Sequence, residues 1–78
     1  MRILISRHAL LKIRQRRISK KLVIETVRSP DLMLPGRSGR EELYKRFRTQ
    51  NLKVVVVRDE RVITVVTVHW IARLTNRQ

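Results

Sequence analysis

The apolar positions near the start of the chain recur at the spacing of one helix face. Ala9, Leu10 and Ile13 follow that spacing. Ser6 stands just ahead of them as a good N-cap, because its hydroxyl can accept a hydrogen bond from a backbone N–H of the first helical turn. The pattern therefore predicts a helix over residues 6–17.

A second helical pattern follows after a short break. Leu22, Val23 and Val27 fall on one face of a helix that we expect over residues 20–28. Pro30 ends this helix, because the residue before a proline is pushed out of helical geometry.

From residue 32 onward the pattern becomes that of strands. Leu32–Leu34 predict a short edge strand, and further strands are expected at about 41–48, 52–58 and 61–70. The last two are rich in β-branched residues, which favour strands over helices. Two helices followed by a twisted antiparallel sheet of three to four strands predict a single α+β domain over residues 1–78.

The last strand carries apolar residues on both faces. Strict alternation puts Val68 and Trp70 on one face, and Ile63 and Val65 on the other. The two helices can cover only one of these faces. The second face is then either a small second core formed by curling of the sheet, or an apolar patch that pairs with a partner or a second copy.

The charge balance points to a polyanionic partner. The chain holds 19 Lys and Arg against 6 Asp and Glu, which gives a formal net charge of +13. These cations are interleaved with the apolar positions, so folding displays them on a surface, and nucleic acid is the simplest partner. The chain has no cysteine and no apolar run near the ~20 residues of a membrane span, so we expect a cytoplasmic protein without membrane contact.

Two groups of cations lie on the predicted helices. His8, Lys12 and Arg16 are spaced four residues apart and form one stripe beside the buried face. The stripe is either a solvated basic face or the rim of a cleft between helix and sheet. Lys20 and Lys21 occupy the first turn of the second helix, where the helix dipole favours anions, so a phosphate bound there would offset their repulsion.

The loop and strand after the second helix supply further candidates for nucleic-acid binding. Arg37 and Arg40 lie in a loop with two glycines that could wrap a phosphate. Tyr44, Arg46 and Arg48 share one face of the strand that follows, and the tyrosine could stack on a base.

Acid–base cleavage of RNA needs a base that takes the 2′-hydroxyl proton and an acid that protonates the leaving 5′-oxygen, and two histidines can fill these roles. It also needs a cation that stabilises the charged phosphorane, which Lys or Arg can supply. His69 joins His8 as the second imidazole, and alternation places it with Thr67 on the face of Ile63 and Val65. The few carboxylates form no ligand cluster, so we expect neither a metal site nor a cofactor.

Several short motifs follow one another along nearly the whole chain: Ser6-Arg7-His8-Ala9, Lys12-Ile13, Arg16 with Ile18-Ser19, Pro30, Tyr44-Lys45-Arg46-Phe47 and Thr67-Val68-His69-Trp70. Their order and spacing resemble a prokaryotic family called domain of unknown function 4258. The resemblance implies a RelE/ParE-like (BrnT-like) toxin fold, with N-terminal helices against a twisted antiparallel sheet.

The same resemblance implies a function. That superfamily includes endonucleases that cut RNA without a metal and are neutralised by a small antitoxin encoded alongside. Carried over by position, the matching candidates are His8, Lys12, Arg16, Lys45 and Thr67. The leading hypothesis is a toxin-type, metal-independent endoribonuclease acting on free or ribosome-bound RNA.

In that hypothesis His8 is the general base or acid, and Arg16 and Lys45 stabilise the phosphorane. Thr67 or His69 positions the scissile phosphate. Two alternatives stay open: a non-catalytic, basic nucleic-acid-binding protein, and an interaction module that pairs with a small acidic antitoxin or with itself as a homodimer.

Overall fold

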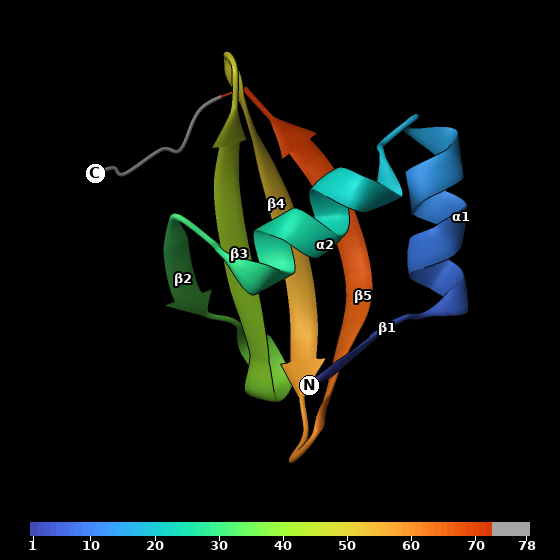
Figure 1. Ribbon diagram of the computed structural model, residues 1–78, viewed down its shortest axis with the longest axis vertical. Coiled ribbons are helices and arrows are strands. Elements are labelled where there is room, and N and C mark those ends of the chain that lie inside the picture. The colour runs from blue at the N-terminus through green and yellow to red at the C-terminus, as the bar shows by residue number, and fades with distance from the viewer. Residues whose placement is uncertain (73–78) are drawn as a thin grey trace.

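The computed structural model describes residues 1–72, which form five strands, two α-helices and one short 3₁₀ turn at Arg37–Gly39. In chain order the elements are β1 (Arg2–Ile5), α1 (Arg7–Gln15), α2 (Lys20–Arg28), β2 (Leu32–Pro35), β3 (Arg40–Phe47), β4 (Gln50–Arg58) and β5 (Val62–Ile71). The strands form one sheet in the order β1-β5-β4-β3-β2 (Figure 1).

The expected α+β class is confirmed, but the expected antiparallel sheet of three to four strands is wrong. The sheet has five strands and is mixed, because the N-terminal segment Arg2–Ile5 adds a strand that runs parallel to β5. The other neighbouring pairs are antiparallel, as expected. Within residues 1–72, no helix is long and apolar enough to cross a membrane.

The helices begin and end close to where the sequence predicts. The Ser6 hydroxyl accepts a hydrogen bond of 3.0 Å from the backbone N–H of Ala9, which caps α1. Arg17 has a φ of 53°, a left-handed conformation that glycine adopts more easily, and it turns the chain from α1 towards α2. The backbone N–H of Ile18 then bonds back to the carbonyl of Ile13 at 2.9 Å.

The hydrophobic core lies between the helices and one face of the sheet. In Figure 1, α2 crosses this face while α1 runs beside the part of β5 that continues beyond the short edge strand β1. The buried apolar residues of the helical segment are Ala9, Ile13, Ile18, Val23 and Val27. They pack against a sheet layer formed by Leu43, Leu52, Val54, Val56, Ile63, Val65 and Val68. Phe47 and Trp70 extend this layer with an edge-to-face contact, their ring centroids 6.3 Å apart.

A β-bulge interrupts the pairing of β4 with β5. Val56 pairs with Val65 and Val55 pairs with Thr67, so Val66 is an extra residue without a partner on β4. An extra residue of this kind shifts the two-residue alternation of a strand by one position.

The bulge overturns the predicted distribution of side chains on β5. Ile63 and Val65 before it, and Val68 after it, all lie in the core beneath the helices. Thr67 and His69 therefore lie on the opposite face, not on the face of Ile63 and Val65 as strict alternation predicts.

The sheet face turned away from the helices, which we call the open face, is apolar at its centre. Tyr44 and Val55 are buried there, with exposed fractions of 6% and 9%. Leu4 and Val57 lie nearer its ends and remain about two-fifths exposed, at 42% and 38%. The open face thus buries Tyr44 and Val55 and still presents apolar surface towards its margins.

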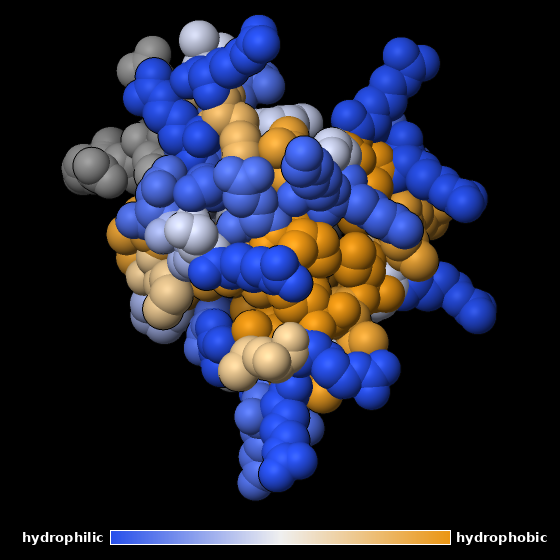
Figure 2. All heavy atoms as spheres, in the orientation of Figure 1, coloured by the Kyte–Doolittle hydropathy of each residue, from blue (hydrophilic) through white to orange (hydrophobic). Residues whose placement is uncertain are grey.

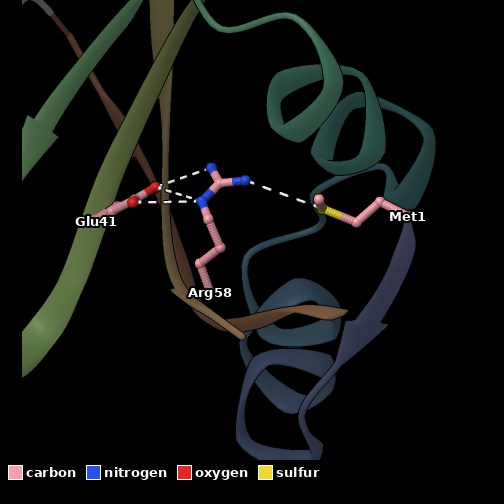
Figure 3. A network of polar contacts seen from close by, with 3 residues as sticks. All are labelled: Met1, Glu41 and Arg58. Carbon is pink, nitrogen blue, oxygen red and sulfur yellow. Dashed lines mark hydrogen bonds and ion pairs between the residues drawn. The ribbon is translucent and has the colours of Figure 1, made fainter. Parts of the chain in front are cut away.

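One ion pair joins the two central antiparallel strands on the helical side. The guanidinium of Arg58 donates to Glu41 from Nη2 at 2.9 Å and from Nε at 3.2 Å, and its Nη1 lies 3.9 Å from the sulfur of Met1 (Figure 3). This bidentate contact raises the pKa of Arg58, chiefly through the hydrogen bond to Glu41. It links β3, β4 and the N-terminus at the end of the sheet far from His69.

Candidate active site

The end of α1 meets β5 at His69. Strand β1 pairs with β5 only as far as Val65, and α1 then runs beside the continuing strand. Arg16, the C-cap residue of α1, donates a hydrogen bond of 2.5 Å from Nη1 to the carbonyl of Val68. The same Nη1 lies 2.9 Å from Nδ1 of His69. The end of α1 therefore places the guanidinium of Arg16 in contact with the imidazole of His69.

This contact determines the state of the His69 ring. A guanidinium can only donate hydrogen bonds, so Nδ1 of His69 must accept, and the proton of the neutral ring lies on Nε2. Partial burial lowers the pKa of His69, and the positive charges of Arg16, Lys53 and Lys12 lower it further. The imidazole is neutral at neutral pH and faces three cations.

Lys53 continues the site across the open face. It is the cross-strand neighbour of His69 on one side and of Tyr44 on the other, so the three side chains form a row across β3, β4 and β5. Its Nζ lies 3.8 Å from a carboxylate oxygen of Glu42 and 5.9 Å from the centre of the Tyr44 ring. The row places an ammonium beside the histidine and holds it there with a carboxylate.

Tyr44 is a packing residue of this row. Its hydroxyl donates a hydrogen bond of 2.9 Å to Glu42. Burial raises the pKa of Tyr44 to about 12, and the hydrogen bond and negative charge of Glu42 act in the same direction. With 6% of its surface exposed, the ring has no open face on which a base could stack, contrary to the role expected for it.

A comparison with known protein families assigns the chain to one of them. Residues 5–70 match the family described as Domain of unknown function (DUF4258). The chain belongs to this family. No curated protein and no solved structure gives a significant match. The matched span of the DUF4258 domain runs from the end of β1 to near the end of β5, and so contains Arg16, Lys53 and His69.

The DUF4258 fold brings together four of the residues singled out from the sequence. Arg16 touches His69, Lys12 is close enough to lower its pKa, and Thr67 precedes it by two positions on the same face. His8 belongs to the same α1 stripe and is exposed, but it lies about 12 Å along the helix from Arg16, at 1.5 Å per residue.

Lys45 lies on the other side of the sheet. Its Nζ donates a hydrogen bond of 2.7 Å to the carbonyl of Ser29 and lies 3.7 Å from Asp31, just after α2. It shares the helical face with the buried Leu43, because alternate residues of β3 point the same way. Lys45 thus anchors the end of α2 to β3, and the sheet separates it from His69.

The other predicted phosphate-binding cations lie on separate elements. Two begin α2, one begins the 3₁₀ turn and one follows it, and two lie near the hairpin between β3 and β4; all are exposed: Lys20, Lys21, Arg37, Arg40, Arg46 and Arg48. The Nε of Arg46 donates to the carbonyl of Arg48 at 2.9 Å, which turns that side chain towards the hairpin. None of the six belongs to the row of Tyr44, Lys53 and His69.

Sequence reasoning missed Lys53. The signal was present, since Lys53 is the one charged residue in the otherwise apolar run of residues 52–57. Its meaning depends on its pairing with His69, which only the sheet register supplies. Among residues 1–72, no three His, Cys, Asp or Glu side chains are grouped so that they could hold a metal ion.

Proposed function

We propose that this DUF4258 protein is a toxin-type, metal-independent endoribonuclease of the RelE/ParE-like superfamily, with its active site around His69 on the open face. One observation carries the proposal: a neutral imidazole contacts Arg16 and lies beside Lys12 and Lys53. A histidine that is neutral at working pH is suited to take up a proton, and neighbouring cations are suited to a phosphodiester. The formal charge of +13 favours the approach of RNA.

The chemistry assigns a role to each of these groups. His69 takes the proton of the 2′-hydroxyl while the 2′-oxygen bonds to phosphorus. Arg16 and Lys12 stabilise the negative charge that develops on the phosphorane oxygens, with Lys53 beside them. The bond from phosphorus to the 5′-oxygen breaks, the 5′-oxygen takes a proton from solvent, and His69 returns its own to solvent. The products are a 2′,3′-cyclic phosphate and a free 5′-hydroxyl.

The test compares the two histidines. Purified wild type, His69→Ala and His8→Ala proteins are incubated with mixed-sequence single-stranded RNA in EDTA, and the fragment ends are identified. We expect cyclic phosphate ends from wild type, a rate lower by about 10²–10⁴-fold for His69→Ala, and near wild-type cleavage by His8→Ala. Equal rates for wild type and His69→Ala, or loss of cleavage in His8→Ala alone, would contradict the assignment.

A second function is favoured by a separate observation. Six exposed cations lie outside the row of Tyr44, Lys53 and His69, and such a scattered basic surface suits backbone binding without cleavage. A non-catalytic nucleic-acid-binding protein would leave RNA intact. Its log affinity would fall by about 0.7–0.9 per log unit of salt for each phosphate neutralised.

We also propose a small acidic protein as the partner of the helical side. A hollow of about 360 Å³ beside α1 is lined by the buried Ile13, by Leu10 and Leu11, which are 37% and 51% exposed, and by Arg7, Arg14 and Lys20. Figure 2 shows apolar surface on this side with hydrophilic side chains projecting around it. An acidic amphipathic helix matches both the apolar hollow and the cations around it. A second copy of the chain would instead bring a further net charge of +13 and be repelled.

The partner proposal has its own test, with a synthetic acidic amphipathic helix as the probe in calorimetric titrations. We expect binding by wild type and at least tenfold weaker binding by Leu11→Asp, which places a carboxylate in the hollow. Equal affinity of the two proteins would refute this docking site.

A further inference from the structure

The hydrogen bond between Arg16 and His69 occupies the nitrogen that a general base needs. Nδ1 of His69 accepts from Arg16 at 2.9 Å, so its lone pair is engaged. Nε2 carries the proton of the neutral ring and can only donate. In the free protein, therefore, neither ring nitrogen presents a lone pair to a 2′-hydroxyl, although the ring is neutral.

We propose that Arg16 holds His69 in this blocked tautomer until a phosphodiester draws the guanidinium away and frees Nδ1 as the general base. This inference rests on the proposed function, because it concerns the regulation of the same site. Arg16 is then a positioning residue before RNA binds and a phosphate ligand afterwards.

The relative strength of the two contacts gives the direction of the switch. A guanidinium and a phosphate carry opposite charges, so their hydrogen bonds gain a Coulomb attraction that the bond from Arg16 to a neutral imidazole lacks. Its planar fork also fits two phosphate oxygens at once, which a single imidazole nitrogen cannot match. Arg16 is exposed at the end of α1, so its side chain can turn without disrupting the core, and in turning it also gives up its hydrogen bond to the carbonyl of Val68.

The surrounding charges reinforce the switch. Arg16 and Lys12 face His69 from α1, and Lys53 faces it from β4 with Glu42 beside it on β3. The three cations disfavour the imidazolium in the free protein. A phosphodiester among them offsets this repulsion, so its arrival both frees Nδ1 and makes the ring more basic.

Nuclear magnetic resonance tests the proposal without cleavage. Long-range proton–nitrogen spectra of ¹⁵N-labelled protein report which ring nitrogen carries the proton, and His8→Ala leaves His69 as the one histidine in the chain. The probe is a mixed-sequence 2′-O-methyl RNA hexanucleotide, which binds but lacks the attacking hydroxyl. We expect the Nε2-protonated tautomer in the free protein, and with saturating probe a rise in the His69 titration midpoint and a gain of the Nδ1-protonated tautomer.

A matched pair of variants isolates the hydrogen bond from the charge. Arg16→Met and Lys12→Met each remove one cation near His69, but only Arg16→Met removes the donor to Nδ1. In the free proteins we expect a tautomer mixture for Arg16→Met and the wild-type tautomer for Lys12→Met. The same tautomer ratio in both variants would overturn the proposal, as would a wild-type ring unaffected by the bound hexanucleotide.

The outcomes separate this inference from the proposed function. If wild type leaves RNA intact in EDTA while the His69 ring responds to the hexanucleotide as expected, the nuclease assignment fails and the Arg16 switch stands. If RNA is cleaved with dependence on His69 while the ring does not respond, the switch fails and the nuclease assignment stands.

Discussion

The bulge at Val66 makes a sharp prediction, because it decides which side chains of β5 enter the core. Deleting Val66 restores strict alternation from Ile63 to the end of the strand. Because Val66 is the extra residue, its deletion places Thr67 directly after Val65 in the ladder, so Val68 and Trp70 stay in the core and Thr67 and His69 stay on the open face.

The opposite outcome, in which the deletion turned Val68 and Trp70 to the open face and Thr67 and His69 under the helices, would be costly because of the burial of these side chains. Val68 is fully buried, and removing a valine from a core costs about 1.5–3 kcal/mol. Trp70 packs on the same core, and the polar groups that would replace them cost about 1–3 kcal/mol each when buried without partners. A loss of about 5 kcal/mol or more compares with a total stability of roughly 4–12 kcal/mol at 0.05–0.15 kcal/mol per residue.

Urea unfolding followed by circular dichroism measures this loss. The control is Val66→Ala, which keeps the extra residue and trims a half-buried side chain, so its loss should be about 1 kcal/mol or less. We expect the deletion variant to fold, with a loss in the free energy of unfolding of about 1 kcal/mol, similar to that of the control. A deletion variant that is unfolded in water, or that loses about 5 kcal/mol, would refute the view that Val66 is the extra residue that sets the two faces.

Four further predictions concern single residues. The acidic limb of the pH profile of kcat/KM for RNA cleavage should have its midpoint below 6.5, the ordinary pKa of histidine. The lowered pKa keeps His69 neutral further into the acid range. In Lys53→Met the midpoint of this limb should move to higher pH, because one cation that repels the imidazolium is gone. An unchanged midpoint would count against the row of Tyr44, Lys53 and His69 on the open face. The single tyrosine should ionise with a midpoint at about 12, followed by its ultraviolet absorbance, and a midpoint at the ordinary 10.0 would show that Tyr44 is neither buried nor bonded to Glu42. Lys45→Met should leave RNA cleavage within about twofold of wild type and lower stability by about 1 kcal/mol, the scale of one lost hydrogen bond, whereas a hundredfold loss of cleavage would return Lys45 to the active site.

Part of the candidate site was visible in the sequence. Helical spacing puts His8, Lys12 and Arg16 on one stripe, and the structure keeps two of them near His69. The spacing does not tell which end of the stripe meets the sheet. That depends on how α1 lies along β5, so the proposed general base is His69 and no longer His8.

The sequence by itself determined the local elements. The Ser6 cap, the stop at Pro30 and the β-branched run after Leu52 each act through neighbouring residues, and the predicted helices and later strands appear close to their expected bounds. It also determined the strongly basic charge of the surface, which needs no knowledge of the fold.

Only the tertiary structure decided which side chains meet. The pairing of Arg2–Ile5 with β5 joins segments about sixty positions apart, and no local pattern encodes such a contact. The bulge at Val66 depends on the packing of both halves of β5 against the helices, and a strand's alternation has a period of two, so one extra residue moves every later side chain to the other face. For this physical reason His69 lies beside Arg16 and Lys53 on the open face, a placement that strict alternation could not reveal.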